Sequence, residues 1–176
     1  MTTQTPFKRL VLRAVLRNVS PIVIRVLAVP DYLDLPNFDE VFRTILDWDD
    51  LGFIFRVHGQ EFNSFRRRTK SKRLAEFQLR TQEKFLYTCG AIDLWEWELR
   101  LLDQEDGAHG DKVPICLAGR GAAPLEYCGG PTGYRLILKR QQQGKSMYTP
   151  AQVEMVIGML SADAPGSANR HVGLAT

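Results

Sequence analysis

Long uninterrupted apolar runs are absent from this chain of 176 residues. The N-terminal segment MTTQTPFKRL has no apolar core long enough for a signal peptide, and no later stretch approaches the roughly 20 residues that span a bilayer. We therefore expect a cytoplasmic protein without a membrane partner. Hydrophobic residues make up 44% of the sequence and charged residues 24%, which is the balance of an ordinary globular protein and excludes general disorder.

Cysteine is scarce: the chain has three, Cys89, Cys116 and Cys128. An odd number of cysteines in a chain without an export signal argues against a disulfide framework. We expect reduced thiols.

Acidic residues are missing from one segment, 65–73 (FRRRTKSKR), which carries six positive charges and no negative one. The net charge of +3 would be 3 − 6 = −3 without it, so basicity is a local feature. One interpretation is a loop that contacts nucleic-acid phosphates, flanked by Phe62 and Phe65, which can stack on exposed bases. The other is a solvated excursion between strands, because no known nucleic-acid-binding motif surrounds the segment. The candidate contacts are Arg66, Arg67, Arg68, Lys70, Lys72 and Arg73.

Five segments have the composition of strands. Residues 10–17 and 22–29 are rich in aliphatic and β-branched residues on either side of a turn, which predicts a hairpin. Residues 53–57 predict a middle strand. Residues 84–89 and 94–102 predict a second hairpin, in which the second strand alternates apolar and polar side chains.

Three segments have helical signals. Apolar residues recur at three- and four-residue steps over 35–48, with Asp34 placed as the N-cap. A second helix is predicted from Gly133 to the polar stretch 141–144. A third, over 150–161, follows a capping-box pattern. Strands that come in hairpin pairs favour an α+β fold with a mostly antiparallel sheet of two hairpins plus a middle strand, packed against about three helices.

We expect one domain over residues 1–162, because the chain is long enough to bury a single core. The tail, 163–176, is small and polar enough to be disordered.

The stretch 113–134 is rich in Gly, Pro and Cys yet apolar, so it predicts an ordered loop packed on the domain. The residues expected to shape this loop are Cys116, Gly119, Pro124, Cys128, Gly129, Gly130 and Pro131. Its motifs P-x-C-L-A-G and P-x-E-x-C-G-G-P-x-G-Y, with L-R-x-V-x-P-x-x-x-R-x-x-x-V-P at 16–30, resemble the plasmid pRiA4b Orf-3-like family. The resemblance implies an α+β fold and a bacterial type of protein carried by mobile elements or as a transposon passenger. It implies no particular activity.

The chain departs from the pattern of that family in the middle. Relatives tend to have two histidines where this chain has Gly52 and Ile54, and a D-F-G sequence where it has 90–92. Trp97 stands where relatives have a histidine, and Ala123 where they often have a cysteine. A corner that is polar in relatives has therefore become apolar here.

Three hypotheses for function follow. The first is a non-catalytic accessory module of mobile DNA that binds DNA through 65–73. The second is a metal-dependent enzyme or a zinc-stabilised domain, which would require ligands from Cys89, Cys116, Cys128 and His109. The third is an interaction domain, as a homodimer or with another protein, that uses an apolar Trp95/Trp97 surface or an open sheet edge. We favour an accessory or interaction module without a cofactor.

Overall fold

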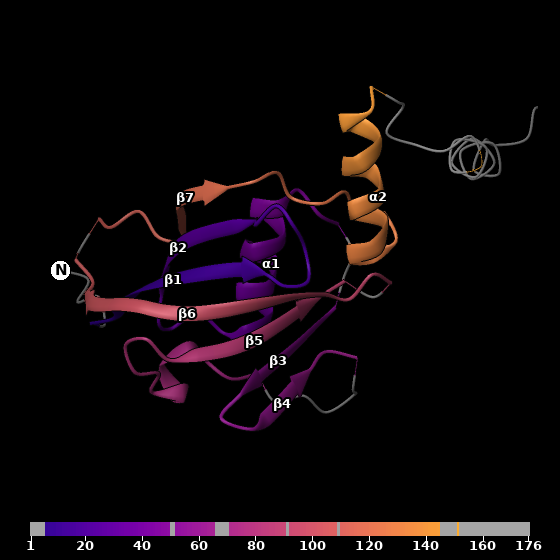
Figure 1. Cartoon of the computed structure of the whole chain (residues 1–176). Coiled ribbons are helices and arrows are strands. Elements are labelled where there is room, and N and C mark those ends of the chain that lie inside the picture. Colours follow the sequence, from indigo (N-terminus) through magenta and orange to yellow (C-terminus); the bar gives the residue numbers. More distant parts are fainter. Residues whose placement is uncertain are drawn as a thin grey trace, which may run out of the picture. The chain divides into compact units, whose positions relative to one another are not determined.

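The computed structural model describes residues 6–49, 52–65, 71–90, 92–108, 110–144 and Ala151. The chain divides into two compact units, Met1–Arg135 and Leu136–Thr176. Its elements are β1 (Lys8–Leu16), β2 (Ile24–Pro30), α1 (Leu35–Leu46), β3 (Phe53–Val57), β4 (Gln60–Asn63), a 3₁₀ helix (Leu74–Phe77), β5 (Lys84–Cys89), β6 (Trp95–Asp106), β7 (Ile115–Arg120) and α2 (Gly130–Gln142). The described strands form one seven-stranded sheet in the order β4-β3-β5-β6-β1-β2-β7, and every neighbouring pair is antiparallel (Figure 1).

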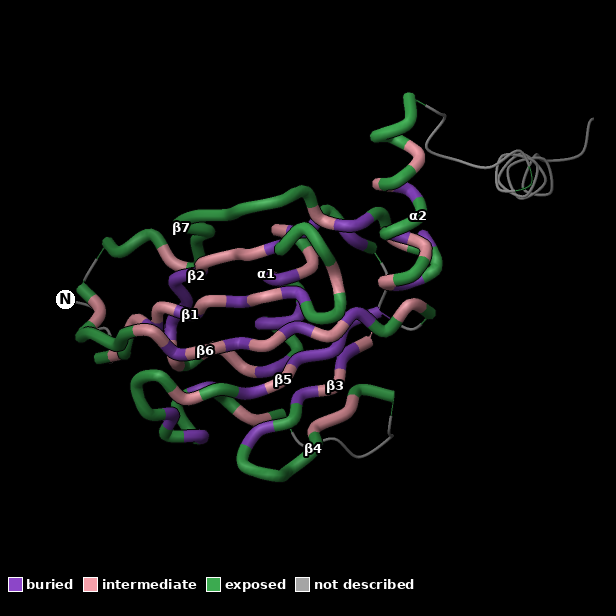
Figure 2. The backbone as a smooth tube through the Cα atoms, viewed as in Figure 1, coloured by how far each residue is buried: buried purple, intermediate pink, exposed green. Residues whose placement is uncertain are grey.

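Helix α1 lies against one face of this sheet (Figure 1), and rings on its buried side pack on rings of the sheet. Its buried residues recur at helical spacing, whereas β6 alternates buried and half-buried residues, as Figure 2 shows. Rings of α1 meet rings of the sheet at centroid distances of 5.0 to 6.0 Å. The rings in this aromatic core are those of Phe38, Phe42, Phe55, Tyr87 and Trp97.

The start of α1 was predicted correctly, since the Asp34 carboxylate accepts a hydrogen bond from the Asn37 backbone N–H at 3.0 Å. Its predicted end at Trp48 was wrong by two residues. The chain leaves the helix at Asp47, which has a left-handed φ of 58° and donates its backbone N–H to the carbonyls of Arg43 and Thr44.

Other predictions need correction in part. The α+β class and both hairpins are confirmed, but the described residues hold two α-helices rather than about three. The third predicted helix, 150–161, lies outside the described residues apart from Ala151, as does the tail 163–176. The stretch 113–134 is not a loop throughout, because it contains β7 and its last residues begin α2. β4 and β7 had not been predicted as strands.

The proposed Trp95/Trp97 surface does not exist. Trp95 is 2% exposed and Trp97 0%, because both side chains point from β6 into the core beneath α1. In the described part of the chain, no helix is long and apolar enough to cross a membrane.

Candidate functional site

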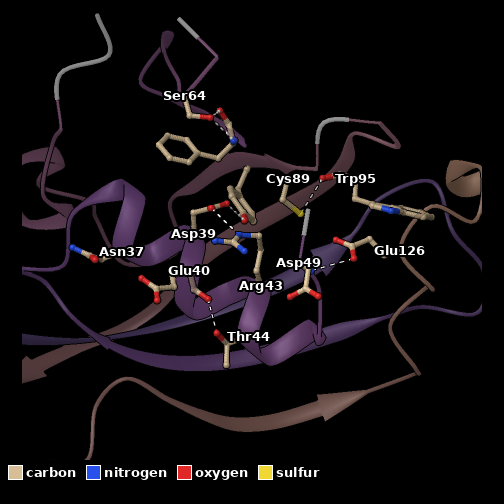
Figure 3. Close-up of polar contacts among 12 residues, drawn as sticks. Asn37, Asp39, Glu40, Arg43, Thr44, Asp49, Ser64, Cys89, Trp95 and Glu126 are labelled. Atoms are coloured by element: carbon tan, nitrogen blue, oxygen red, sulfur yellow. Dashed lines mark hydrogen bonds and ion pairs between the residues drawn. The ribbon is translucent and has the colours of Figure 1, made fainter. Parts of the chain in front are cut away.

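A buried polar cluster joins α1 to the sheet (Figure 3). The Asp39 residue is 4% exposed, and its carboxylate accepts two hydrogen bonds. Arg43, one turn further along α1, donates from Nε to Oδ2 at 2.9 Å, and the hydroxyl of Tyr87 on β5 donates to Oδ1 at 2.6 Å. A buried carboxylate needs such partners, since an unpaired charge in the interior is expensive. The cluster therefore fixes the rotation of α1 on the sheet.

The charges of this cluster balance at neutral pH. Burial raises the pKa of Tyr87 well above its usual range, with Cys89 and Asp39 adding to the effect, so the phenol stays neutral. Burial lowers the pKa of Arg43, but the hydrogen bond and the charge of Asp39 more than offset it, and the net shift is upward. One guanidinium thus compensates one carboxylate.

Cys89 lies beside the cluster at the end of β5 and donates its thiol to the Trp95 carbonyl at 3.8 Å (Figure 3). Burial raises the pKa of this thiol to about 12, against the opposing effect of Tyr87. The thiolate is the nucleophilic form of cysteine, and it is not populated near neutral pH at such a pKa. Cys89 is therefore a packing residue rather than a nucleophile.

Beside the cluster, the first turns of α1, the start of β3 and the two residues that follow β4 line an open hollow of about 420 Å³. From α1 it is lined by Asn37, Glu40 and Arg43, and from the other side by Ser64 and Phe65. Its volume lies within the range of small-molecule sites, roughly 300 to 1,000 Å³. It is the place where the buried cluster reaches solvent.

Two charged groups in the hollow keep hydrogen-bonding capacity. Among the described residues, the Arg43 guanidinium bonds through Nε alone, which leaves its two terminal amino groups without a partner. The Glu40 carboxylate, on the adjacent turn, likewise has no hydrogen-bond partner in the described part of the chain. The negative charge of Glu40 contributes to the raised pKa of Arg43, so the two groups lie within electrostatic reach. The hollow presents hydrogen-bond donors beside an acceptor.

Phe65 forms an apolar edge of this hollow. Its residue is 52% exposed, and its ring covers the backbone of Gly52, where an added Cβ would lie 2.3 Å from the ring. The Ser64 hydroxyl accepts from the backbone N–H of Phe53 at 2.8 Å, which holds the start of this segment on β3. An exposed aromatic ring therefore lies against Gly52, immediately before the basic residues.

The structure places the predicted basic contacts in two groups. Lys72 and Arg73 both contact the 3₁₀ helix. The Lys72 ammonium lies 4.4 Å from the ring centroid of Phe77, and the Arg73 backbone N–H donates to the Glu76 carboxylate at 2.9 Å. The others, Arg66, Arg67, Arg68 and Lys70, lie outside the described residues.

Of the two aromatic residues predicted to flank the basic segment, Phe62 packs edge-on against Phe77 with 5.3 Å between ring centroids. Phe65 is the more exposed of the two, which leaves it as the candidate for stacking on a base.

The Gly/Pro/Cys stretch is held by side chains from the rest of the fold. Arg25 donates from Nη1 to the carbonyl of Gly121 at 3.0 Å, and the indole N–H of Trp48 donates to the carbonyl of Pro124 at 3.0 Å. The backbone N–H of Gly129 donates to Asp93 at 3.1 Å. These bonds satisfy backbone groups that a non-repetitive segment would otherwise leave unpaired.

The three cysteines bond to three different carbonyls. Cys89 and Cys128 are buried, whereas Cys116 is exposed on β7 and its thiol lies 3.5 Å from the Ala118 carbonyl oxygen. Within the described residues, no group of three or more His, Cys, Asp or Glu side chains is placed to hold a metal ion. His109, the fourth predicted ligand, lies outside those residues.

Sequence reasoning missed Asp39, Glu40 and Arg43. A signal was present, because Leu35, Phe38, Asp39 and Phe42 follow the i, i+3, i+4, i+7 spacing of one helical face. A carboxylate within such a stripe, with an arginine four residues later, indicates a buried ion pair.

Taken together, the fold is an antiparallel seven-stranded α+β domain with an open hollow between α1 and the residues that follow β4. The chain belongs to the plasmid pRiA4b ORF-3-like family, whose family model matches residues 8–156. No curated protein matches the sequence. A solved structure that it resembles is that of MM3350 from Methanosarcina mazei Go1, described as a protein of unknown function. The TM-score is 0.70 and the identity 22%, over 88% of this chain and 90% of that one. At this identity the likeness shows the fold.

Proposed function

We propose that this protein is a non-catalytic module that binds single-stranded nucleic acid, in keeping with the association with mobile DNA that the family resemblance implies. The basic side chains of 65–73, apart from Lys72, which packs on Phe77, contact phosphates, and the exposed ring of Phe65 stacks on a base. Aromatic platforms beside clustered cations are the common means of binding single strands.

The observation that carries this proposal is the position of Phe65. It is a 52% exposed aromatic residue whose ring lies against Gly52, and it directly precedes three arginines in the sequence. Burying such a ring against solvent-exposed bases removes apolar surface from water, whereas the neighbouring cations release counterions from phosphates. Cys89, whose thiol pKa is about 12, and the paired Asp39 supply no reactive group, which supports a binding role over catalysis.

The test is binding to single-stranded and duplex DNA over a series of salt concentrations. The variant Arg66→Ala/Arg67→Ala/Arg68→Ala is expected to bind more weakly. The slope of log K against log salt should fall by about 2 for single strands, at roughly 0.7 per lost phosphate contact.

A matched control replaces Lys112, Arg120 and Lys139 with Ala, which removes the same charge from exposed positions elsewhere. Equal slopes of log K against log salt in the two triple variants would show that the weaker binding comes from the change in net charge and not from the position of the arginines. No binding by the wild-type protein at low salt would remove the proposal.

A second candidate function is self-association through β7. All six residues of this strand are exposed, it lies at the edge of the sheet, and it carries the exposed apolar side chains Ile115 and Leu117. Exposed apolar edge strands are templates for pairing with a second chain. Solution mass measurement tests this candidate: a dimer that Leu117→Lys converts to a monomer supports it, and a wild-type monomer at every concentration rejects it.

A further inference from the structure

We propose that the hollow between α1 and the residues that follow β4 receives one guanine base of the bound strand. This inference rests on the proposed function and adds a preference that phosphate contacts cannot provide, because phosphates are the same at every nucleotide. The hollow is the described cavity that combines an exposed aromatic ring with hydrogen-bonding groups lacking protein partners.

The position of the base follows from Phe65. A base stacked on this ring lies over the hollow, since Phe65 is part of its lining. Stacking alone tolerates any base, because every base has a π-face. Discrimination must therefore come from the polar groups that line the hollow from α1, where Figure 3 shows Glu40 and Arg43.

Those groups are Glu40 and Arg43, three residues apart and thus neighbours on the helix surface. The Glu40 carboxylate offers two acceptor oxygens, and Arg43 offers the N–H groups of its terminal amino groups. The Nε hydrogen bond to the buried Asp39 holds the guanidinium in place, so Arg43 does not have to be ordered on binding.

Guanine complements this pair. Its Watson–Crick edge presents O6 as an acceptor, followed by N1–H and the N2 amino group as two parallel donors. A carboxylate takes both donors at once, and an adjacent guanidinium donates to O6. Adenine and cytosine have one amino donor beside a ring acceptor, and thymine has one N–H between two carbonyls, so each leaves one Glu40 oxygen unmatched or facing an acceptor.

The experiment measures the affinity for a thymidine oligomer of about ten nucleotides and for the same oligomer with one central guanine. The wild-type protein is expected to bind the guanine-containing strand about tenfold more tightly, in the range of one bidentate contact. Glu40→Gln should abolish that ratio, because the amide replaces one acceptor oxygen with a donor. Asp49→Asn is the matched control: it removes one exposed negative charge outside the hollow and should preserve the ratio.

A second pair of variants tests the stacking. Phe65→Ala should weaken binding of both oligomers, whereas Tyr32→Ala, at a residue that is similarly exposed (53%), should weaken neither. Equal wild-type affinities for the two oligomers would overturn the guanine inference and leave the proposed function standing.

If neither oligomer binds, the proposed function fails. Binding of guanosine monophosphate (GMP) then tests whether the hollow is a guanine site. Saturable binding of GMP that Glu40→Gln abolishes would retain the guanine site for a free nucleotide. Absence of GMP binding would overturn it.

Discussion

We expect the free energy of unfolding of this protein to fall at alkaline pH because of one buried thiol, Cys89. The residue is 0% exposed, and burial raises its pKa from 9.0 to about 12. The unfolded chain therefore releases this proton at a lower pH than the folded chain does. Stability from this group is fully present below about pH 9 and is lost progressively as the pH rises toward 12.

The magnitude follows from the shift. One proton released on unfolding changes the unfolding free energy by about 1.4 kcal/mol per pH unit. Between about pH 8 and about pH 10.5, the thiol accounts for a loss of roughly 2 kcal/mol. The variant Cys89→Ala lacks this term, so urea unfolding at the two pH values should show the wild-type protein losing about 2 kcal/mol more than the variant.

The exposed Cys116 provides the matched control, because Cys116→Ala should keep the wild-type pH dependence. Tyr87 and Cys128 also have raised pKa values and titrate in all three proteins. Burial is the largest cause of the raised pKa of Tyr87, so that pKa stays raised in Cys89→Ala. If Cys89→Ala loses as much stability as the wild type over this range, the thiol is not desolvated and the packing of β5 against α1 is wrong.

Three further measurements probe the fold. Gly121→Ala should lower the free energy of unfolding more than Gly59→Ala does. Both glycines have a positive φ, 76° and 72°, but an added Cβ at Gly121 would lie 2.7 Å from a backbone oxygen, whereas one at Gly59 would have no atom within 4 Å. Equal losses of stability in the two variants would contradict the close approach at Gly121. Tyr87→Phe should cost about 1.5 to 3 kcal/mol in urea unfolding, because it removes a buried hydrogen bond to a carboxylate, whereas Tyr32→Phe should cost less than about 0.5. In the native protein at neutral pH, a thiol reagent such as DTNB should titrate one cysteine rapidly, the exposed Cys116; rapid reaction of all three would show that the other two are accessible.

The parts of the fold that could be read from the sequence are those whose signals are local. β3 and β5 have the bounds predicted, 53–57 and 84–89, because apolar and β-branched runs end there at turns. β7 gave no such signal, since both its faces are exposed and its residues do not alternate. It is a strand because β2 offers it a free edge. Pairing between segments about 90 residues apart cannot be predicted from the sequence of either segment alone.

The same limit applies to the basic segment. Composition identified 65–73 as a unit, but its members serve different purposes in space. The Lys72 ammonium lies on the face of the Phe77 ring, a contact that depends on the chain returning through the 3₁₀ helix. A count of charges along the sequence cannot separate a cation that packs on a neighbouring ring from one that is available to a ligand.

Asp39 is where local pattern and tertiary role disagree most. An apolar residue would continue the stripe of α1, and replacing a buried ion pair with apolar residues is often neutral or stabilising. The carboxylate therefore gives the helix little stability that a leucine would not give. What it provides is a fixed Nε hydrogen bond to Arg43, which orients the guanidinium at the base of the hollow. Departures from the expected pattern concentrate at functional positions. The buried Asp39 thus joins α1 to Tyr87 on β5 and holds Arg43 at the hollow, and the second contact supports the hollow over the Gly/Pro/Cys stretch as the proposed binding site.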